Sequence, residues 1–227
     1  MKNIKIKIGV LQAPPVWMVS VSCSDNFLEF ALTGLLAEDK LTVMAVLGAS
    51  LIASYYQVNG RFQRMASPSN WVWGRIRGGD ANKGTDPGDF NTINPIQRFE
   101  TDATDGNILE NWNGLYEGIA RANNVWRLLL SRGEDVTDAD VKRISAQARF
   151  LRGHYYFKCK RNFDNVPYVD ETVDYGSGLV DVVNNMDIWP MIEADFQFAA
   201  DNLAPTQGQV GRVNSWAAKA YLAKVLL

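Results

Sequence analysis

The chain has 227 residues, enough for one domain or for part of a larger protein. Its 47% hydrophobic and 11% aromatic residues can build a buried core, which excludes a chain that is disordered throughout. A net charge of −2 excludes bulk attraction to nucleic acid, and two cysteines with one histidine leave no CxxC or HExxH motif. Since Gly-rich phosphate loops are also absent from the sequence, the composition points away from most catalysis, and we expect no cofactor and no metal.

The N-terminus has the features of a bacterial export signal. Three early lysines precede an uncharged stretch, 8–24, and small residues stand directly before Cys23, as in a lipobox whose cysteine is acylated. We therefore predict a signal peptide over 1–22 and a membrane anchor on Cys23. The alternatives are a buried free thiol or an uncleaved N-terminal strand.

Residues 41–60 carry no charge and could in length span a bilayer. Polar side chains dilute this stretch and Gly60 is a typical helix stop, so we predict a buried helix and keep a membrane span as the alternative. The following region, 61–106, has little periodicity and many Gly, Pro, Asn and Asp residues. Its tryptophans and phenylalanines argue against disorder, which predicts an ordered but irregular loop.

Apolar residues then recur at alternating steps of four and three, from Ile108 to Leu129, which predicts a long amphipathic helix. A second stripe, from Val141 to Cys159, follows an N-cap at Thr137, and the short gap predicts an antiparallel hairpin over 107–162. We expect Cys159 to lie in the core and His154 to be a packing residue rather than a base.

A second hairpin is predicted over 187–227, with Asn214 capping its last helix. Its first helix, 187–203, is acidic where the preceding helix is basic, which predicts internal ion pairs, including pairs for Arg149 and Arg152. The expected fold is therefore all-α, with tetratricopeptide-like helical hairpins and a long irregular loop insertion. Three tryptophans on apolar stripes are expected in the core: Trp112, Trp126 and Trp216.

Several segments together resemble the SusD/RagB family of outer-membrane nutrient-binding lipoproteins. They are SCSD (22–25), WVWGRIR (71–77), WNGLYEGIARAN (112–123), ARFLRGHYYF (148–157), NVPYV (165–169) and GRVNSWAAKAYLAK (211–224). Family members are about twice this length, so the resemblance implies that 23–227 is an N-terminal helical-repeat domain, truncated at its C-terminus, whose last helix exposes an apolar face.

The resemblance implies a non-catalytic, lipid-anchored protein on the cell-surface side of the outer membrane. It would bind oligosaccharides or related nutrients for import through a partner SusC-like TonB-dependent transporter. A helical-repeat adaptor that binds only protein is the alternative. A glycoside hydrolase using two of the acids in 80–89 is a further, less favoured, alternative.

Aromatic faces and short polar side chains, the groups that sugars need, coincide in the loop 71–91. The candidate ligand-binding residues are Trp71, Trp73, Asp80, Asn82, Lys83 and Asp89. The tryptophans could instead anchor the loop, and the acids could form turns or pair with Arg75 or Arg77. The spacing of Asp80, Asn82 and Asp86 also suits the start of a calcium loop, although the pattern is incomplete.

Overall fold

The computed structural model describes residues 43–59, 71–84, 86–132, 135–173, 175–176, 178 and 180–227. The predicted signal peptide and Cys23 therefore lie outside the described residues. Within these ranges the long elements are α1 (Val43–Tyr56), α3 (Gly106–Leu130), α4 (Asp138–Phe163), α5 (Trp189–Asn202) and α6 (Ser215–Val225). No β-strand occurs among the described residues, and the predicted all-α class is confirmed.

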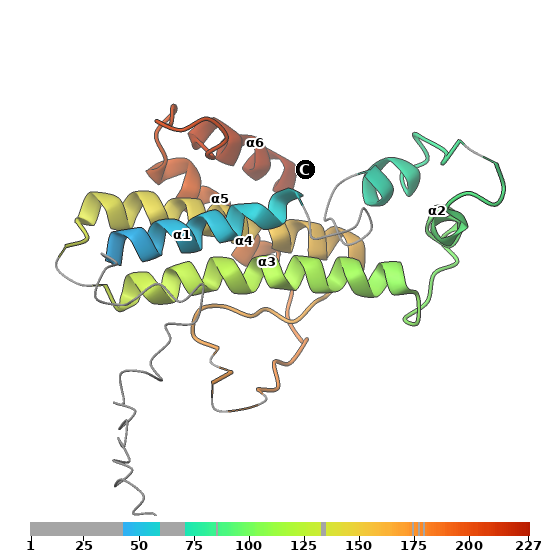
Figure 1. The fold of residues 1–227 in the computed structure, drawn as a ribbon, viewed down its shortest axis with the longest axis horizontal. Coiled ribbons are helices and arrows are strands. Elements are labelled where there is room, and N and C mark those ends of the chain that lie inside the picture. The colour runs from blue at the N-terminus through green and yellow to red at the C-terminus, as the bar shows by residue number, and fades with distance from the viewer. Residues whose placement is uncertain are drawn as a thin grey trace, which may run out of the picture. The chain divides into compact units, whose positions relative to one another are not determined.

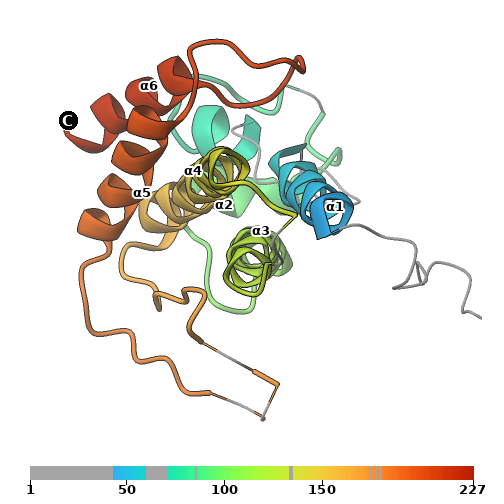
Figure 2. The same ribbon diagram turned by 90° about the vertical axis from the view of Figure 1, so that its left-hand side faces the viewer.

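Helix α4 lies at the centre of the helical bundle, with α1, α3, α5 and α6 around it (Figure 2). Helices α3 and α4 run antiparallel (Figure 1), as the predicted hairpin requires. Because α4 has neighbours on several sides, it is buried almost all round from Ile144 to Lys160, and its free thiol Cys159 is in the core. This burial confirms the prediction for Cys159.

Side-chain caps begin three of the helices where the sequence places an Asp, Thr or Asn. Asp105 accepts a hydrogen bond from the Asn107 N–H at 2.8 Å, and Thr137 accepts one from the Asp140 N–H at 3.1 Å. Asn214 accepts one from the Ala217 N–H at 2.9 Å. The predicted caps at Thr137 and Asn214 are confirmed, and each such cap contributes about 1 kcal/mol.

Helix α1 packs on α3 and α4 with Leu47 and Leu51 fully buried, so the prediction of a buried helix is confirmed for its described part. The α-helix ends at Tyr56 and one 3₁₀ turn, η3 (Gln57–Asn59), follows. In the described part of the chain, no helix has both the length and the apolarity needed to cross a membrane.

The region 71–105 is ordered, but it is more helical than we predicted. It contains a π-helical turn, η4 (Trp71–Ile76), a 3₁₀ turn, η5 (Asn91–Ile93), and a short helix, α2 (Asn94–Arg98). Segments this short carry no apolar periodicity, so the sequence does not reveal them. They are stabilised by a small separate core of Val72, Trp73, Ile93 and Ile96.

The connector after α4 is held to the bundle by side chains instead of strand pairing. Tyr116 Oη donates to the Pro167 carbonyl at 2.7 Å, and the Arg127 guanidinium donates to the Glu171 and Val173 carbonyls at 2.8 and 2.7 Å. These bonds satisfy backbone acceptors that would otherwise need water or a sheet partner.

The prediction for Trp216 is wrong, because its side chain is 64% exposed. Helix α6 packs on α5 and α4 through a face that includes the buried Ala218, and Trp216 stands on the opposite side of this edge helix. Together with Leu226 it gives α6 the exposed apolar surface that we expected. Trp112 and Trp126 are half-buried and pack against the core, in line with their prediction.

Candidate functional site

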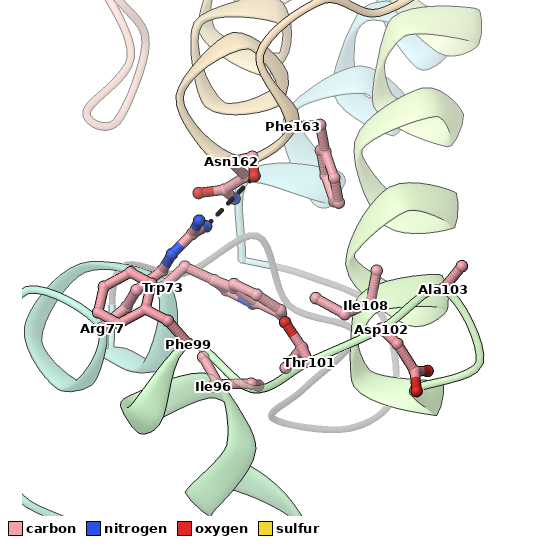
Figure 3. Close-up of a pocket in the computed structure, with 10 residues that line it drawn as sticks. All are labelled: Trp73, Arg77, Ile96, Phe99, Thr101, Asp102, Ala103, Ile108, Asn162 and Phe163. Atoms are coloured by element: carbon pink, nitrogen blue, oxygen red, sulfur yellow. Dashed lines mark hydrogen bonds between the residues drawn. The ribbon is translucent and has the colours of Figure 1, made fainter.

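A cleft of about 310 Å³ lies between the region 71–105 and the adjacent ends of α3 and α4 (Figure 3). It is within the size range of small-molecule sites, roughly 300–1,000 Å³. Its lining combines aromatic, aliphatic and polar side chains: Trp73, Arg77, Ile96, Phe99, Thr101, Asp102, Ala103, Ile108, Asn162 and Phe163. The mixture suits a ligand that has both apolar and hydrogen-bonding faces.

Trp73 brings an unsatisfied donor to this cleft. The residue is 8% exposed, and its buried indole Nε1–H has no hydrogen-bond partner among the described residues. Leaving such a donor unpaired costs about 1–3 kcal/mol. Figure 3 shows the indole among the lining side chains.

Phe99 is an exposed aromatic side chain in a strained backbone conformation. It follows α2 with φ 57° and ψ 35°, in the left-handed region that glycine usually occupies at a helix C-terminus. Its side chain is 67% exposed, so burial of the ring does not offset this strain. Strained residues of this kind cluster at ligand clamps, which favours a binding role for the Phe99 ring.

Arg77 connects the region 71–105 to α4. Its Nη1 donates to the Asn162 carbonyl at 3.3 Å, shown as the dashed line in Figure 3, and its guanidinium lies 5.5 Å from the centroid of the Phe99 ring. The Asn162 side chain in turn donates to Asn111 Oδ1 at 3.3 Å. This chain of contacts orients the polar groups on the α4 side of the cleft.

A second cleft, of about 230 Å³, shares four of the same lining residues. They are Trp73, Arg77, Phe99 and Asn162, and the remaining lining is Gly74, Gly78 and Arg161. The two clefts together present aromatic rings beside amide and guanidinium donors. This is the chemistry that an oligosaccharide requires, because sugars have apolar C–H faces and polar hydroxyls.

Of the predicted ligand-binding residues, Trp73 alone lines these two clefts. Trp71 is outside their lining and stacks on Phe90, with the ring centroids 6.3 Å apart and the planes at 29°. The Lys83 ammonium donates to the carbonyls of Asp86 and Asp89, and Asn82 Oδ1 accepts from the Gly84 N–H at 3.1 Å. Asp80 and Asp89 are exposed. Ligand contact by these loop residues stays a prediction.

One acid of this loop, Asp86, takes part in a turn, which is one of the two alternatives for these acids. Asp86 Oδ1 accepts from the N–H groups of Gly88 and Asp89 at 3.0 and 3.1 Å. No ion pair joins this loop to Arg75 or Arg77 among the described residues. The same part of the chain contains no group of three His, Cys, Asp or Glu side chains able to hold a metal ion.

Phe99, Arg161 and Asn162 are cleft residues that the sequence reasoning missed. Phe99 lies in the irregular region 61–106 but after the candidate loop 71–91. An aromatic residue among polar neighbours was the available signal. Arg161 and Asn162 belong to another helix, and no local pattern connects them to Trp73.

The structure is a helical-repeat scaffold with an aromatic-lined cleft. A family model described as "Starch-binding associating with outer membrane" matches residues 88–227, and the chain belongs to this SusD-like family. The family predicted from the sequence motifs is thereby confirmed.

Two curated relatives share the family name. A SusD-like protein of Bacteroides ovatus is 32% identical over 131 residues, covering 57% of this chain and 24% of that protein. SusD-like protein P2 of Formosa agariphila is 29% identical over 239 residues, covering 100% of this chain and 43% of that protein. The chain thus covers less than half the length of either relative.

Solved structures of the family have the same fold. A laminarin binding SusD-like protein superposes with a TM-score of 0.64 at 27% identity, covering 79% of this chain and 39% of that one. A SusD superfamily protein of Parabacteroides distasonis gives a TM-score of 0.66 at 24% identity, with 82% and 40% covered. These superpositions confirm the tetratricopeptide-like helical fold.

Proposed function

We propose that this chain is the N-terminal, glycan-binding part of a surface lipoprotein of the outer membrane. In this proposal Cys23 carries the lipid anchor, residues 1–22 are removed, and captured oligosaccharides pass to a SusC-like TonB-dependent transporter. Family membership and the laminarin binding relative support this function, as does the cleft itself. We propose binding without catalysis.

The observation that carries the proposal is the pairing of Trp73 and Phe99 in one cleft. Trp73 holds a buried, unpartnered N–H and Phe99 presents an exposed ring on strained backbone. Neither feature stabilises the fold, whereas a sugar bound in the cleft would lie against the indole and stack on the phenyl ring. The loop residues Trp71, Asp80, Asn82, Lys83 and Asp89 are proposed as additional contacts.

The test uses Phe99→Gly, because glycine tolerates the left-handed backbone and so does not destabilise the fold. We expect oligosaccharide affinity, measured by calorimetry and tryptophan fluorescence, to fall by roughly tenfold or more, as for an aromatic anchor that the ligand covers. Thermal unfolding should show equal or greater stability.

The matched control is Phe90→Gly, since Phe90 also has positive φ, 48°, and lies outside the lining of both clefts. Affinity should fall less in this variant than in Phe99→Gly, because Phe90 reaches the site only through the Trp71 ring that stacks on it and the small core that holds Trp73. Weakened binding in Phe90→Gly with normal binding in Phe99→Gly would move the site to the Trp71–Phe90 pair. No binding of any oligosaccharide by the unmodified chain would contradict the proposed function.

A further inference from the structure

The smaller of the two clefts carries positive charge without a compensating acid. Its lining contains the guanidinium groups of Arg77 and Arg161 and no Asp or Glu side chain. We propose that this cleft selects glycans that bear carboxylate groups, as uronic acids do, over neutral glycans. The inference rests on the proposed function and names the substrate class that the function leaves open.

Both guanidinium groups have unused donors. Arg77 donates through Nη1 to the Asn162 carbonyl, and its other N–H groups have no hydrogen-bond partner within the described ranges. The Arg161 guanidinium lies over the Phe157 ring, 5.4 Å from its centroid. It makes no hydrogen bond or ion pair with any other described residue. Guanidinium groups bind carboxylates through paired, charge-assisted hydrogen bonds, which are about twice as strong as neutral ones.

No acid near the cleft forms an ion pair with Arg77 or Arg161 among the described residues, and most of these acids have other partners. Glu100 pairs with Arg98 at 2.7 Å, and Asp164 pairs with Lys160 at 3.0 Å. Asp102, which lines only the larger cleft, accepts from the Thr104 N–H and hydroxyl at 2.8 and 2.6 Å. Figure 3 shows its carboxylate directed away from Arg77. A ligand carboxylate would therefore not compete with a protein carboxylate for Arg77 or Arg161.

The end of α4 adds to the positive surroundings. Its last turn carries the basic residues Lys160 and Arg161. The C-terminal carbonyls of a helix normally repel anions. Here the Asn162 carbonyl accepts from Arg77, which reduces that repulsion where the cleft is lined.

The test compares a galacturonate hexamer with its fully methyl-esterified form, which has the same backbone but no charge. Calorimetry at low salt should show that the unmodified chain binds the acid at least roughly tenfold more tightly. Arg161→Gln should remove most of this preference, and combining it with Arg77→Gln should remove the rest. Added salt should weaken binding of the acid more than binding of the ester.

Arg75→Gln is the matched control, because Arg75 is exposed on η4 and lines neither cleft. It makes the same charge change and should keep the preference. Equal binding of acid and ester would overturn this inference and leave the proposed function standing. A preference that persists in Arg77→Gln/Arg161→Gln would also overturn it. If neither hexamer nor a neutral glucan oligosaccharide binds, the proposed function fails as well.

Discussion

At the residue scale, Asp195 shows how one buried acid organises this fold. The carboxylate is 1% exposed and accepts from Arg149 Nε at 2.7 Å and from Arg152 Nε and Nη2 at 2.7 and 2.8 Å. Burial alone would lower the pKa of Arg152, but the hydrogen bonds and charge of Asp195 outweigh it and the pKa is raised. The predicted pairing of Arg149 and Arg152 with the acidic helix is therefore confirmed.

Asp195→Ala should be strongly destabilising, because the buried Arg152 guanidinium keeps Glu171, at 2.6 Å, as its one ionic partner among the described residues. Breaking a buried pair on one side costs about 3–5 kcal/mol of the free energy of unfolding. Urea unfolding of the variant at pH 7 checks this loss. The control is Glu193→Ala, an exposed acid on the same helix, which should change stability by no more than about 0.5 kcal/mol. Similar losses in both variants would refute a special role for Asp195.

At the element scale, a glycine sets the spacing of α3 and α4. A Cβ atom on Gly118 would lie 2.7 Å from the Tyr155 ring. That ring is fully buried and its hydroxyl donates to the Ser54 carbonyl at 2.6 Å, so it has little freedom to move away. The close approach of the two helices thus depends on the absence of a side chain at Gly118.

Gly118→Ala should destabilise the chain. Overpacking against Tyr155 costs about 1–3 kcal/mol, and the higher helix propensity of alanine offsets roughly 1 kcal/mol of that cost. Gly48→Ala is the control, since Gly48 lies within α1 and its added Cβ would meet no described atom within 4 Å beyond its own helix backbone and chain neighbours. It should stabilise the chain by up to about 1 kcal/mol. Thermal unfolding of both variants checks the opposite signs, and two shifts in the same direction would contradict this account.

At the scale of the whole molecule, His154 couples α4 to the last helix. The imidazole is 6% exposed, and its Nδ1 lies 2.8 Å from Tyr221 Oη on α6. Burial, followed by the charges of Lys158 and Lys224, lowers the pKa of His154 to about 3. The predicted packing role agrees with this position, and the neutral ring is the form that the fold accommodates.

Stability should therefore fall as the pH drops through the window between an unfolded pKa of about 6.5 and the folded value of about 3. In this window the unfolded chain binds a proton that the folded chain does not, so acid favours unfolding. Urea unfolding at pH 7 and pH 4.5 measures the loss, and His154→Gln should reduce it. Tyr221→Phe should keep the loss of stability at low pH, because burial is the main cause of the lowered His154 pKa. A pH dependence that is unchanged in His154→Gln would contradict this assignment.

The sequence by itself determined the long helices, two of their caps and the family. Apolar spacing, and residues such as Thr137 and Asn214, act within a few turns of chain, so they can be recognised without knowing the fold. The motif that contains Trp73 and Arg77 also contributes both residues to the lining of the proposed site.

Only the tertiary structure decided which side chains share the cleft and which helix face is covered. Asn162 and Arg161 join Trp73 because the end of α4 packs beside the region 71–105, and no local pattern encodes that contact. Trp216 is exposed for the same reason, since an apolar stripe is buried only where a neighbouring element covers it.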